Sequence, residues 1–376
     1  MATQAEAVQT QTSVSNTFSA GNSRQGKSKK KLVRRANRDY SQVWRRCYQA
    51  AFLALNIWLG GIFYWWVRGI ESGAGTASAP PAGVEGWLPI AGLMNLKYLL
   101  VTGRVPGIHA AAMFLLIAFL TTAFLLRKAF CSWLCPVGAV SEYLGRLGRW
   151  FFGRNFVLWR SIDIPLRGLK YVLLGFFAWA ISTMSAEAIA AFMRSDYGVV
   201  AAVKMLNFFR YLSGTAAIVL GCLAVASLFV KNFWCRYLCP YGAMLGFASM
   251  LSPLRIWREP EPCIDCGKCA KACPSALPVD RLISIKSAEC TGCLECVAVC
   301  PAEGALQMSL PKIARHQRVP AWAVAAGIAA VFFGIVGYAK AAGVWSSPIA
   351  PATYRQLVPH ASEARHPMPG DPELSR

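Results

Sequence analysis

The sequence predicts an all-α polytopic membrane protein of about five transmembrane helices, with a small α+β domain inserted before the last helix. Three observations predict this fold class. Of the 376 residues, 55% are hydrophobic and only 15% are charged, whereas soluble domains carry about 25% charged residues. The hydrophobic residues lie in long runs, and eight of the 14 cysteines lie close together between the last two runs.

Five apolar runs are long enough to cross a bilayer, because a transmembrane helix needs about 20 predominantly apolar residues. Lys or Arg residues flank every run. We expect the first run to be an uncleaved helix, since the apolar part of a signal peptide is only about 7–15 residues long. The five predicted spans cover residues 47–67, 105–126, 171–193, 211–230 and 319–339.

The basic residues predict which side of the membrane each connection faces. With the N-terminus inside, 29 of the 39 Lys and Arg residues lie in inner segments and 10 in outer segments. Cytoplasmic loops carry such an excess, so we expect a bacterial inner-membrane protein with a periplasmic C-terminus. The net charge of +21 therefore needs no nucleic-acid partner to explain it.

The spans divide the chain into five predicted parts. Residues 1–46 form a basic, largely disordered cytoplasmic tail, and residues 47–258 form a four-helix transmembrane core. Residues 259–312 form the inserted domain, 313–340 contain the fifth span, and 341–376 form an outer tail with Pro-rich disorder. His109 and Glu187 are ionisable residues within predicted spans, and we expect a hydrated His109 near the interface and a deeper Glu187.

A cysteine motif recurs in the membrane part. The sequence CSWLCPVGA starts at Cys131, and CRYLCPYGA starts 104 residues later, at Cys235. Each copy follows a helix predicted to run from the outer to the inner side, so we expect two repeated helical hairpins related by a rough two-fold axis along the membrane normal. The proline suits the first position of a helix. The second and fourth spans are therefore expected to end at Cys135 and Cys239, and residues 137–151 to form an amphipathic surface helix.

The motif cysteines are candidate redox residues, because a thiol at a helix N-terminus has a lowered pKa. Their roles stay open among a redox pair on each hairpin, a shared metal or cluster site, contacts to a cofactor, and simple packing. These candidate catalytic residues are Cys131, Cys135, Cys235 and Cys239.

A second repeat predicts iron–sulfur clusters. The pattern C-x2-C-x2-C-x3-C-P starts at Cys263 and again at Cys290, and it is the signature of bacterial ferredoxins with two [4Fe–4S] clusters. A zinc site would use four thiolates and leave four. The fourth cysteine of each run binds the other cluster, and Gly267 and Gly292 are expected to relax the loops. The predicted ligand sets are Cys263, Cys266, Cys269 and Cys300 for one cluster, and Cys290, Cys293, Cys296 and Cys273 for the other.

The paired CxxxCP motifs followed by the two-cluster ferredoxin pattern resemble the NapH/NosR-type membrane polyferredoxins over about residues 46–310. The resemblance implies electron transfer between the quinone pool, flavin or ferredoxin partners and periplasmic respiratory reductases. Relatives of the FixG/CcoG type imply copper reduction and oxidase assembly. The chain departs from the NapH pattern in its fifth span and outer tail, and no covalent flavin is expected.

The resulting hypothesis is a membrane-bound iron–sulfur protein that passes electrons between quinol or another redox partner and a respiratory reductase system, as a component of a quinol dehydrogenase. The alternatives are a metal (copper) or thiol reductase for metalloenzyme assembly, and a scaffold for redox subunits. Expected partners are the lipid bilayer, a ferredoxin-type subunit and a periplasmic or membrane reductase. A quinone site is expected beside the CxxxCP motifs, where Trp133, Trp234 and Tyr237 either line it or form an interfacial aromatic belt.

Overall fold

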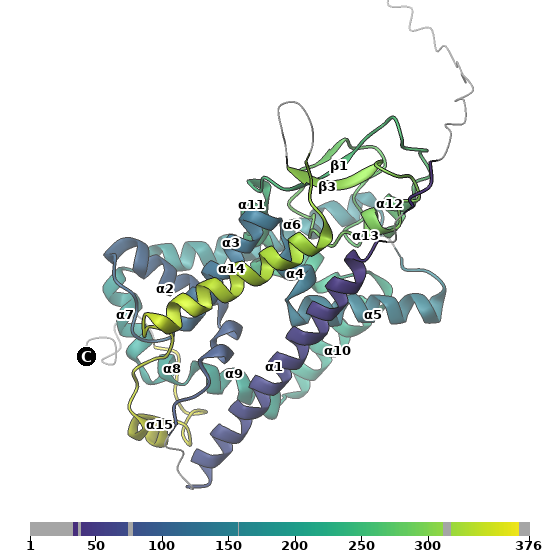
Figure 1. Cartoon of the computed structure of the whole chain (residues 1–376). Helices are drawn as coiled ribbons and strands as arrows, with labels where there is room; N and C mark the ends of the chain where they lie inside the picture. Colours follow the sequence, from purple (N-terminus) through teal and green to yellow (C-terminus); the bar gives the residue numbers. More distant parts are fainter. Residues whose placement is uncertain (1–32, 37–38, 74–77, 157, 311–316, 368–376) are drawn as a thin grey trace, which may run out of the picture.

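Figure 1 shows the computed structural model, which describes residues 33–36, 39–73, 78–156, 158–310 and 317–367. Most of the predicted N-terminal tail, 1–32, lies outside the described residues. Three described helices are long and apolar enough to cross a membrane: α1 (Ser41–Glu71), α6 (Arg160–Thr183) and α14 (Ala321–Ala341). A fourth candidate is the pair α9 (Ala201–Arg210) and α10 (Gly214–Phe229), which is bent by 80°.

The apolar helix α3 (Ala110–Leu126) has 17 residues, which corresponds to about 25 Å at 1.5 Å per residue. Helices α1, α3, α6, α10 and α14 fall in the five predicted spans and alternate in direction between the sheet at one end and α15 (Pro351–Leu357) at the other (Figure 1). The structure therefore has three or four candidate spans by length and composition, and the number five stays a prediction.

The third predicted span, 171–193, is placed wrongly. Helix α6 begins at Arg160 and ends at Thr183, and a separate helix, α7 (Ala186–Arg194), follows it. The side chain of Ser185 accepts a hydrogen bond from the backbone N–H of Ala188, so it caps a new helix. Glu187 is consequently exposed in the first turn of α7, and the prediction that it lies deep in a span is wrong.

The two halves of the membrane part repeat one arrangement. In each half a first helix leads to an apolar helix, then to a short helical turn that carries the motif, then to a helix that begins at the motif proline. The first half consists of α2 (Pro89–Thr102), α3, α4 (Ala129–Trp133) and α5 (Pro136–Phe152). The second consists of α9, α10, η2 (Trp234–Leu238) and α11 (Pro240–Met250).

The halves also pack reciprocally. Helix α5 of the first half lies against α10 of the second, and α11 of the second half lies against α3 of the first. Gly148 permits the first contact, since a Cβ atom there would lie 1.8 Å from the carbonyl oxygen of Leu228. Such an exchange is what a two-fold axis between the halves requires.

The inserted domain contains a four-stranded antiparallel sheet of order β2-β1-β3-β4. Its strands are β1 (Arg255–Arg258), β2 (Ser284–Ile285), β3 (Leu306–Leu310) and β4 (Gln317–Arg318), and two short helices, α12 (Lys268–Ala272) and α13 (Glu295–Ala298), accompany them. The sheet shares one hydrophobic core with the helices, in which Ile256 and Met308 join Phe119 and Ile328. This shared core fixes the domain against the helices α3 and α14.

The outer tail is ordered through residue 367, so the prediction of Pro-rich disorder is wrong for its described part. Helix α15 packs against α1, where the rings of Tyr354 and Trp66 meet edge to face with centroids 5.2 Å apart. Val203 of α9 belongs to the same cluster. The remaining elements at this end are η1 (Ala82–Trp87) and α8 (Asp196–Val199).

Candidate functional site

The eight cysteines of the inserted domain surround two cavities. One cavity is lined by Cys263, Cys266, Cys269 and Cys300, and the other by Cys273, Cys290, Cys293 and Cys296. The fourth cysteine of each run thus joins the first three cysteines of the other run. Two sets of four thiols are the donor sets that two [4Fe–4S] clusters require.

The backbone of both cysteine loops has a repeated shape. The residues on either side of the second cysteine adopt left-handed conformations, with φ of 52° at Asp265 and 67° at Gly267, and 61° at Gly292 and 59° at Leu294. Successive N–H groups in such conformations form concave anion-binding surfaces that are common at iron–sulfur sites. The sequence predicted one of the two left-handed residues in each loop, Gly267 and Gly292. The other two, Asp265 and Leu294, were missed because they are not glycines.

Two of the thiols in the second cavity are deeply buried. Burial raises the pKa of the Cys293 thiol to about 12, and burial also raises the pKa of Cys296 well above its usual range. Thiols bind metals as thiolates, so metal binding there must displace their protons. The donor chemistry and the loop shape both fit the group that the motif indicates.

The CxxxCP motifs do not end the apolar helices, contrary to expectation. Helix α3 stops at Leu126, and Arg127 takes a left-handed conformation with φ of 61°. In the second half α10 stops at Phe229, and Asn232 has φ of 54°. These reversals turn the chain, so each motif lies on its own short segment between two helices.

The structure brings the four motif cysteines together. Each of the four thiols lies within electrostatic interaction range of the other three. Lys128, whose side chain is buried, lies within the same range of Cys131, Cys235 and Cys239. The two halves of the repeat therefore build one site rather than two.

The second cysteine of each motif caps the following helix. The backbone N–H of Gly138 donates to the Sγ of Cys135 at 3.5 Å, and that of Gly242 donates to the Sγ of Cys239 at 3.2 Å. A Cβ atom at Gly138 would lie 2.2 Å from the carbonyl oxygen of Cys131, so a side chain there would force the first motif apart. The sulfurs are held at the N-termini of α5 and α11, where the helix dipole favours negative charge. Burial nevertheless raises the pKa of both thiols, so the prediction of a lowered pKa is wrong.

The middle residues of the two motifs have different contacts. In the first copy, Ser132 donates to the carbonyl of Thr291 at 2.7 Å, and the indole N–H of Trp133 donates to the carbonyl of Gly292 at 3.2 Å. These acceptors lie in the loop between Cys290 and Cys293. The first motif is therefore fastened directly to the loop of the second cluster cavity.

In the second copy, Arg236 and Tyr237 bind the carboxylate of Asp163 in α6, at 2.7 and 2.6 Å. Trp133 and Tyr237 are fully buried in these contacts. Only Trp234 of the three predicted aromatic residues lines the large cavity described next.

A cavity of about 720 Å³ lies next to the motif cysteines. It reaches from the four thiols and Lys128 to η1 and to Lys340 at the outer end of α14. Cys293, one of the ferredoxin cysteines, also borders it. Its walls are mainly apolar and include Phe52, Leu55, Leu59, Leu115, Phe119, Phe130, Phe332 and Val336.

Ion pairs join the cluster loops to the helices. Lys170 of α6, which is fully buried, lies 2.6 and 2.7 Å from the carboxylate oxygens of Glu289, next to Cys290. At the start of α1, buried Arg45 binds Glu142 of α5 at 2.8 Å and Glu295 of α13 at 2.7 Å. Because buried charges need partners, these pairs hold the cysteine loops against α1, α5 and α6.

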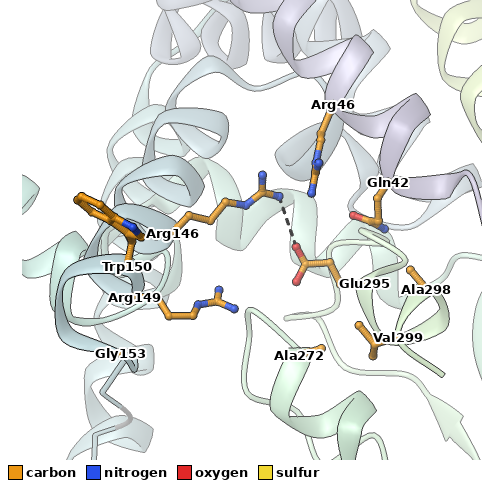
Figure 2. A pocket seen from close by; sticks show the side chains of 10 residues that line it. All are labelled: Gln42, Arg46, Arg146, Arg149, Trp150, Gly153, Ala272, Glu295, Ala298 and Val299. Atoms are coloured by element: carbon orange, nitrogen blue, oxygen red, sulfur yellow. Dashed lines mark ion pairs between the residues drawn. The ribbon is translucent and has the colours of Figure 1, made fainter. Parts of the chain in front are cut away.

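A basic hollow of about 630 Å³ lies between α1, α5 and α13, beside the inserted domain. Figure 2 shows Arg46, Arg146 and Arg149 reaching into it opposite Glu295. Glu295 is already paired with Arg45, so the hollow has a positive excess. Part of its wall comes from residues next to the ferredoxin cysteines, namely Ala272, Ala298 and Val299.

His109 is buried, so the expectation of a hydrated histidine is wrong. Its Nδ1 lies 3.1 Å from a carboxylate oxygen of Glu85, and its Nε2 lies 2.8 Å from the carbonyl oxygen of Gly198. The side chain of Ser347, beyond α14, joins both residues. Sequence reasoning missed this group because its members come from four segments that share no motif.

The comparison with protein-family models finds two matches. A 4Fe-4S binding domain matches residues 108–155 and 212–257, which contain the two CxxxCP motifs. A 4Fe-4S dicluster domain matches residues 255–315, which contain all eight ferredoxin cysteines.

Several known proteins are similar to this chain. YccM of Escherichia coli (strain K12), whose name assigns it electron transport as a provisional role, is 52% identical over 86% of this chain and 92% of its own length. The regulatory protein NosR of Pseudomonas aeruginosa is 32% identical over 49% of this chain and 25% of its own length. The ferredoxin-type protein NapH of E. coli (strain K12) is 25% identical over 55% of this chain and 70% of its own length. No solved structure matches the chain.

Proposed function

The chain belongs to the NapH/NosR-type family of membrane-bound iron–sulfur electron-transport proteins, and from this premise we propose that it exchanges electrons between a membrane quinone and a redox partner at the inner face. In this proposal the inserted domain and the N-terminus are cytoplasmic and the C-terminus is periplasmic. The eight ferredoxin cysteines hold two [4Fe–4S] clusters, in the two sets that line the separate cavities.

The apolar cavity carries the quinone part of the proposal. Its volume of about 720 Å³ lies in the range of about 300–1,000 Å³ that is usual for small-molecule sites. Its walls suit an isoprenoid quinone, because aromatic and aliphatic side chains surround the long part while Lys128 and the thiols supply polar groups at the inner end. Cys293 borders this cavity, so a quinone ring at that end lies close to the second ferredoxin loop.

The number of electrons released by quinol matches the number that two clusters accept. Oxidation of one quinol to quinone releases two electrons and two protons, and two bound [4Fe–4S] clusters supply two one-electron acceptors. Side chains of the chain hold the ring end: Phe119 and Phe130 stack with centroids 3.8 Å apart and form one wall. The buried contacts of Trp133 and Lys170 with the cluster loop keep the distance between cavity and loop fixed.

The basic hollow supports contact with a partner at the inner face. Its arginines come from α1 and α5, and its floor touches the residues beside both groups of ferredoxin cysteines. An acidic surface of a ferredoxin-type subunit complements that charge, and charge complementarity raises association rates. A partner bound here lies beside the cluster loops.

A reduction experiment tests the proposal. Full-length protein with its clusters is mixed in detergent with a reduced quinol analogue, and cluster reduction is followed by absorbance and electron paramagnetic resonance. We expect rapid reduction, which Leu55→Trp slows at least tenfold by filling the cavity. The control Ile57→Trp lies on the exposed side of α1 and outside the cavity, and it should leave the rate unchanged.

Failure of quinol to reduce either cluster contradicts the proposal. Ready reduction of Cu(II) by the dithionite-reduced protein, combined with that failure, would favour the alternative of a metal reductase for metalloenzyme assembly. Clusters that stay oxidised across the range of about −700 to +450 mV that such clusters span would favour a scaffold.

A further inference from the structure

We propose that Cys131, Cys135, Cys235 and Cys239 together bind a third iron–sulfur cluster, held between the two halves of the membrane part. The proposal deepens the function given above and rests on it in one respect, since the same cavity takes the quinone. It leaves one role for the four thiols, a shared cluster, and excludes two disulfide-forming pairs and simple packing.

The number and arrangement of the thiols favour a cluster over a single metal ion. All six pairs among the four thiols are close enough to interact electrostatically, and all 14 cysteines are free thiols. All four cysteines also line one cavity of about 720 Å³. Four thiols around a common space are the donor set that a [4Fe–4S] cluster takes.

The surroundings favour a group with negative charge, which a cluster with four thiolate ligands carries. The N-termini of α5 and α11 both face the site, and a backbone N–H of each donates to a motif sulfur. Lys128 is 3% exposed and lines the same cavity, and its charge acts on Cys131, Cys235 and Cys239 as well as on Glu289. A buried ammonium group stabilises negative charge held beside it.

The two-fold repeat explains why the halves must act together. Each match to the 4Fe-4S binding model contains one CxxxCP pair, and two thiolates are half of the set of four that such clusters take. The reciprocal packing of α5 on α10 and of α11 on α3 brings the two pairs to one place. One cluster on the pseudo-two-fold axis would therefore take two thiolates from each of the two matched segments.

The site also has a direct connection to the second ferredoxin loop. Ser132 and Trp133 lie between Cys131 and Cys135, and they bind the carbonyl groups of Thr291 and Gly292. Those acceptors lie between Cys290 and Cys293. A cluster at the CxxxCP site is thus joined to the second ferredoxin site by short covalent and hydrogen-bonded segments, which is a favourable arrangement for electron transfer.

The direct test is the iron and acid-labile sulfide content of anaerobically purified, full-length protein. Two ferredoxin clusters account for about eight iron atoms per chain, and a third [4Fe–4S] cluster raises the number to about twelve. We expect the surplus iron to disappear in the double variant Cys135→Ser/Cys239→Ser, while the resonance signals of the two ferredoxin clusters persist. These persisting signals report that the variant is folded.

Cys222→Ser is the matched control. Cys222 lies on α10 in the second matched segment, but it is exposed and does not line the cavity, so its loss should leave the iron content unchanged. Wild-type protein with about eight iron atoms overturns the proposal without any variant, as does a surplus that survives the double substitution, or one zinc or copper ion bound in its place.

The outcomes separate this proposal from the function above. About twelve iron atoms with no reduction by quinol would uphold the third cluster and contradict the quinone reaction. About eight iron atoms with normal reduction by quinol would do the reverse.

Discussion

The ammonium group of Lys170 and the carboxylate of Glu289 form a buried ion pair with both oxygens within 2.7 Å of the nitrogen. The pair joins α6 to the residue before Cys290. Tyr171 donates a hydrogen bond to the same carboxylate at 3.2 Å. This contact connects the membrane part to the second cluster loop at a point where neither residue belongs to a recognisable motif.

Glu289→Gln should destabilise the protein strongly. Removing one partner of a buried ion pair typically costs about 3–5 kcal/mol, because the other charge stays buried without a partner. We expect a lower unfolding temperature in detergent and release of iron from the second cluster before the first. Glu261→Gln is the control, since Glu261 is an exposed carboxylate of the same domain. Equal effects of the two substitutions would contradict the importance of the pair.

The same carboxylate predicts a pH dependence. Burial raises the pKa of Glu289, but the charges of Lys128 and Lys170 and the hydrogen bonds from Lys170 and Tyr171 lower it more, so the pKa lies below its usual value. A carboxylate with a lowered folded-state pKa contributes stability above its unfolded pKa of about 4.3 and loses that contribution as the pH falls through the folded-state value. The difference in unfolding temperature between wild type and Glu289→Gln should therefore shrink as the pH drops from about 6 to about 3. A difference that stays constant would show that the charge is unimportant.

Trp133→Phe should alter the second ferredoxin cluster without removing a ligand. The substitution leaves the carbonyl of Gly292 without the indole donor, and a buried unsatisfied group costs about 1–3 kcal/mol. We expect a changed resonance line shape and a lower reduction potential for the cluster of Cys290 and Cys293, because hydrogen bonds around a cluster set its potential. Trp234→Phe, in the second half of the repeat, should leave both quantities unchanged. A shift in the other ferredoxin cluster alone would contradict the assignment.

Arg46→Glu/Arg149→Glu should weaken electron exchange with a negatively charged soluble carrier. Both side chains are exposed in the basic hollow, and reversing two charges should lower the second-order rate at least tenfold at low ionic strength. The rates of variant and wild type should converge at about 1 M salt, where the screening length is about 3 Å. Arg281→Glu, an exposed change elsewhere on the inserted domain, serves as control. An equal loss in that control would indicate a general effect of net charge.

The sequence predicted how the ferredoxin cysteines are grouped in space, but not where several helices end. The ferredoxin signature grouped Cys300 with the first run and Cys273 with the second, and the two cavities are lined in the same groups. The break between Thr183 and Ala186 was missed, since apolar residues continue through it and the only local signal is the capping Ser185. The reversal at Arg127 was missed for a similar reason, because arginine has no preference for φ of 61°.

Contacts between distant segments were beyond sequence reasoning. Trp133 and Tyr237 occupy the same position in the two motifs, and their neighbours could not be read from the repeat, because one copy faces the inserted domain and the other faces Asp163. The burial of His109 beside Glu85 depends on how η1 folds over the start of α3. Such pairings follow from tertiary packing, which leaves no periodic signal in a single sequence.

The contact between Trp66 and Tyr354 has a consequence for biosynthesis. The two rings meet although 287 residues separate them in the chain, so the C-terminal end of α1 lacks this partner until α15 has been synthesised. Throughout that interval the indole and its neighbour Phe63 have only lipid or earlier helices to cover them. Completion of this packing is thus timed by the synthesis of α15, a late segment of the chain that closes the fold around an early one.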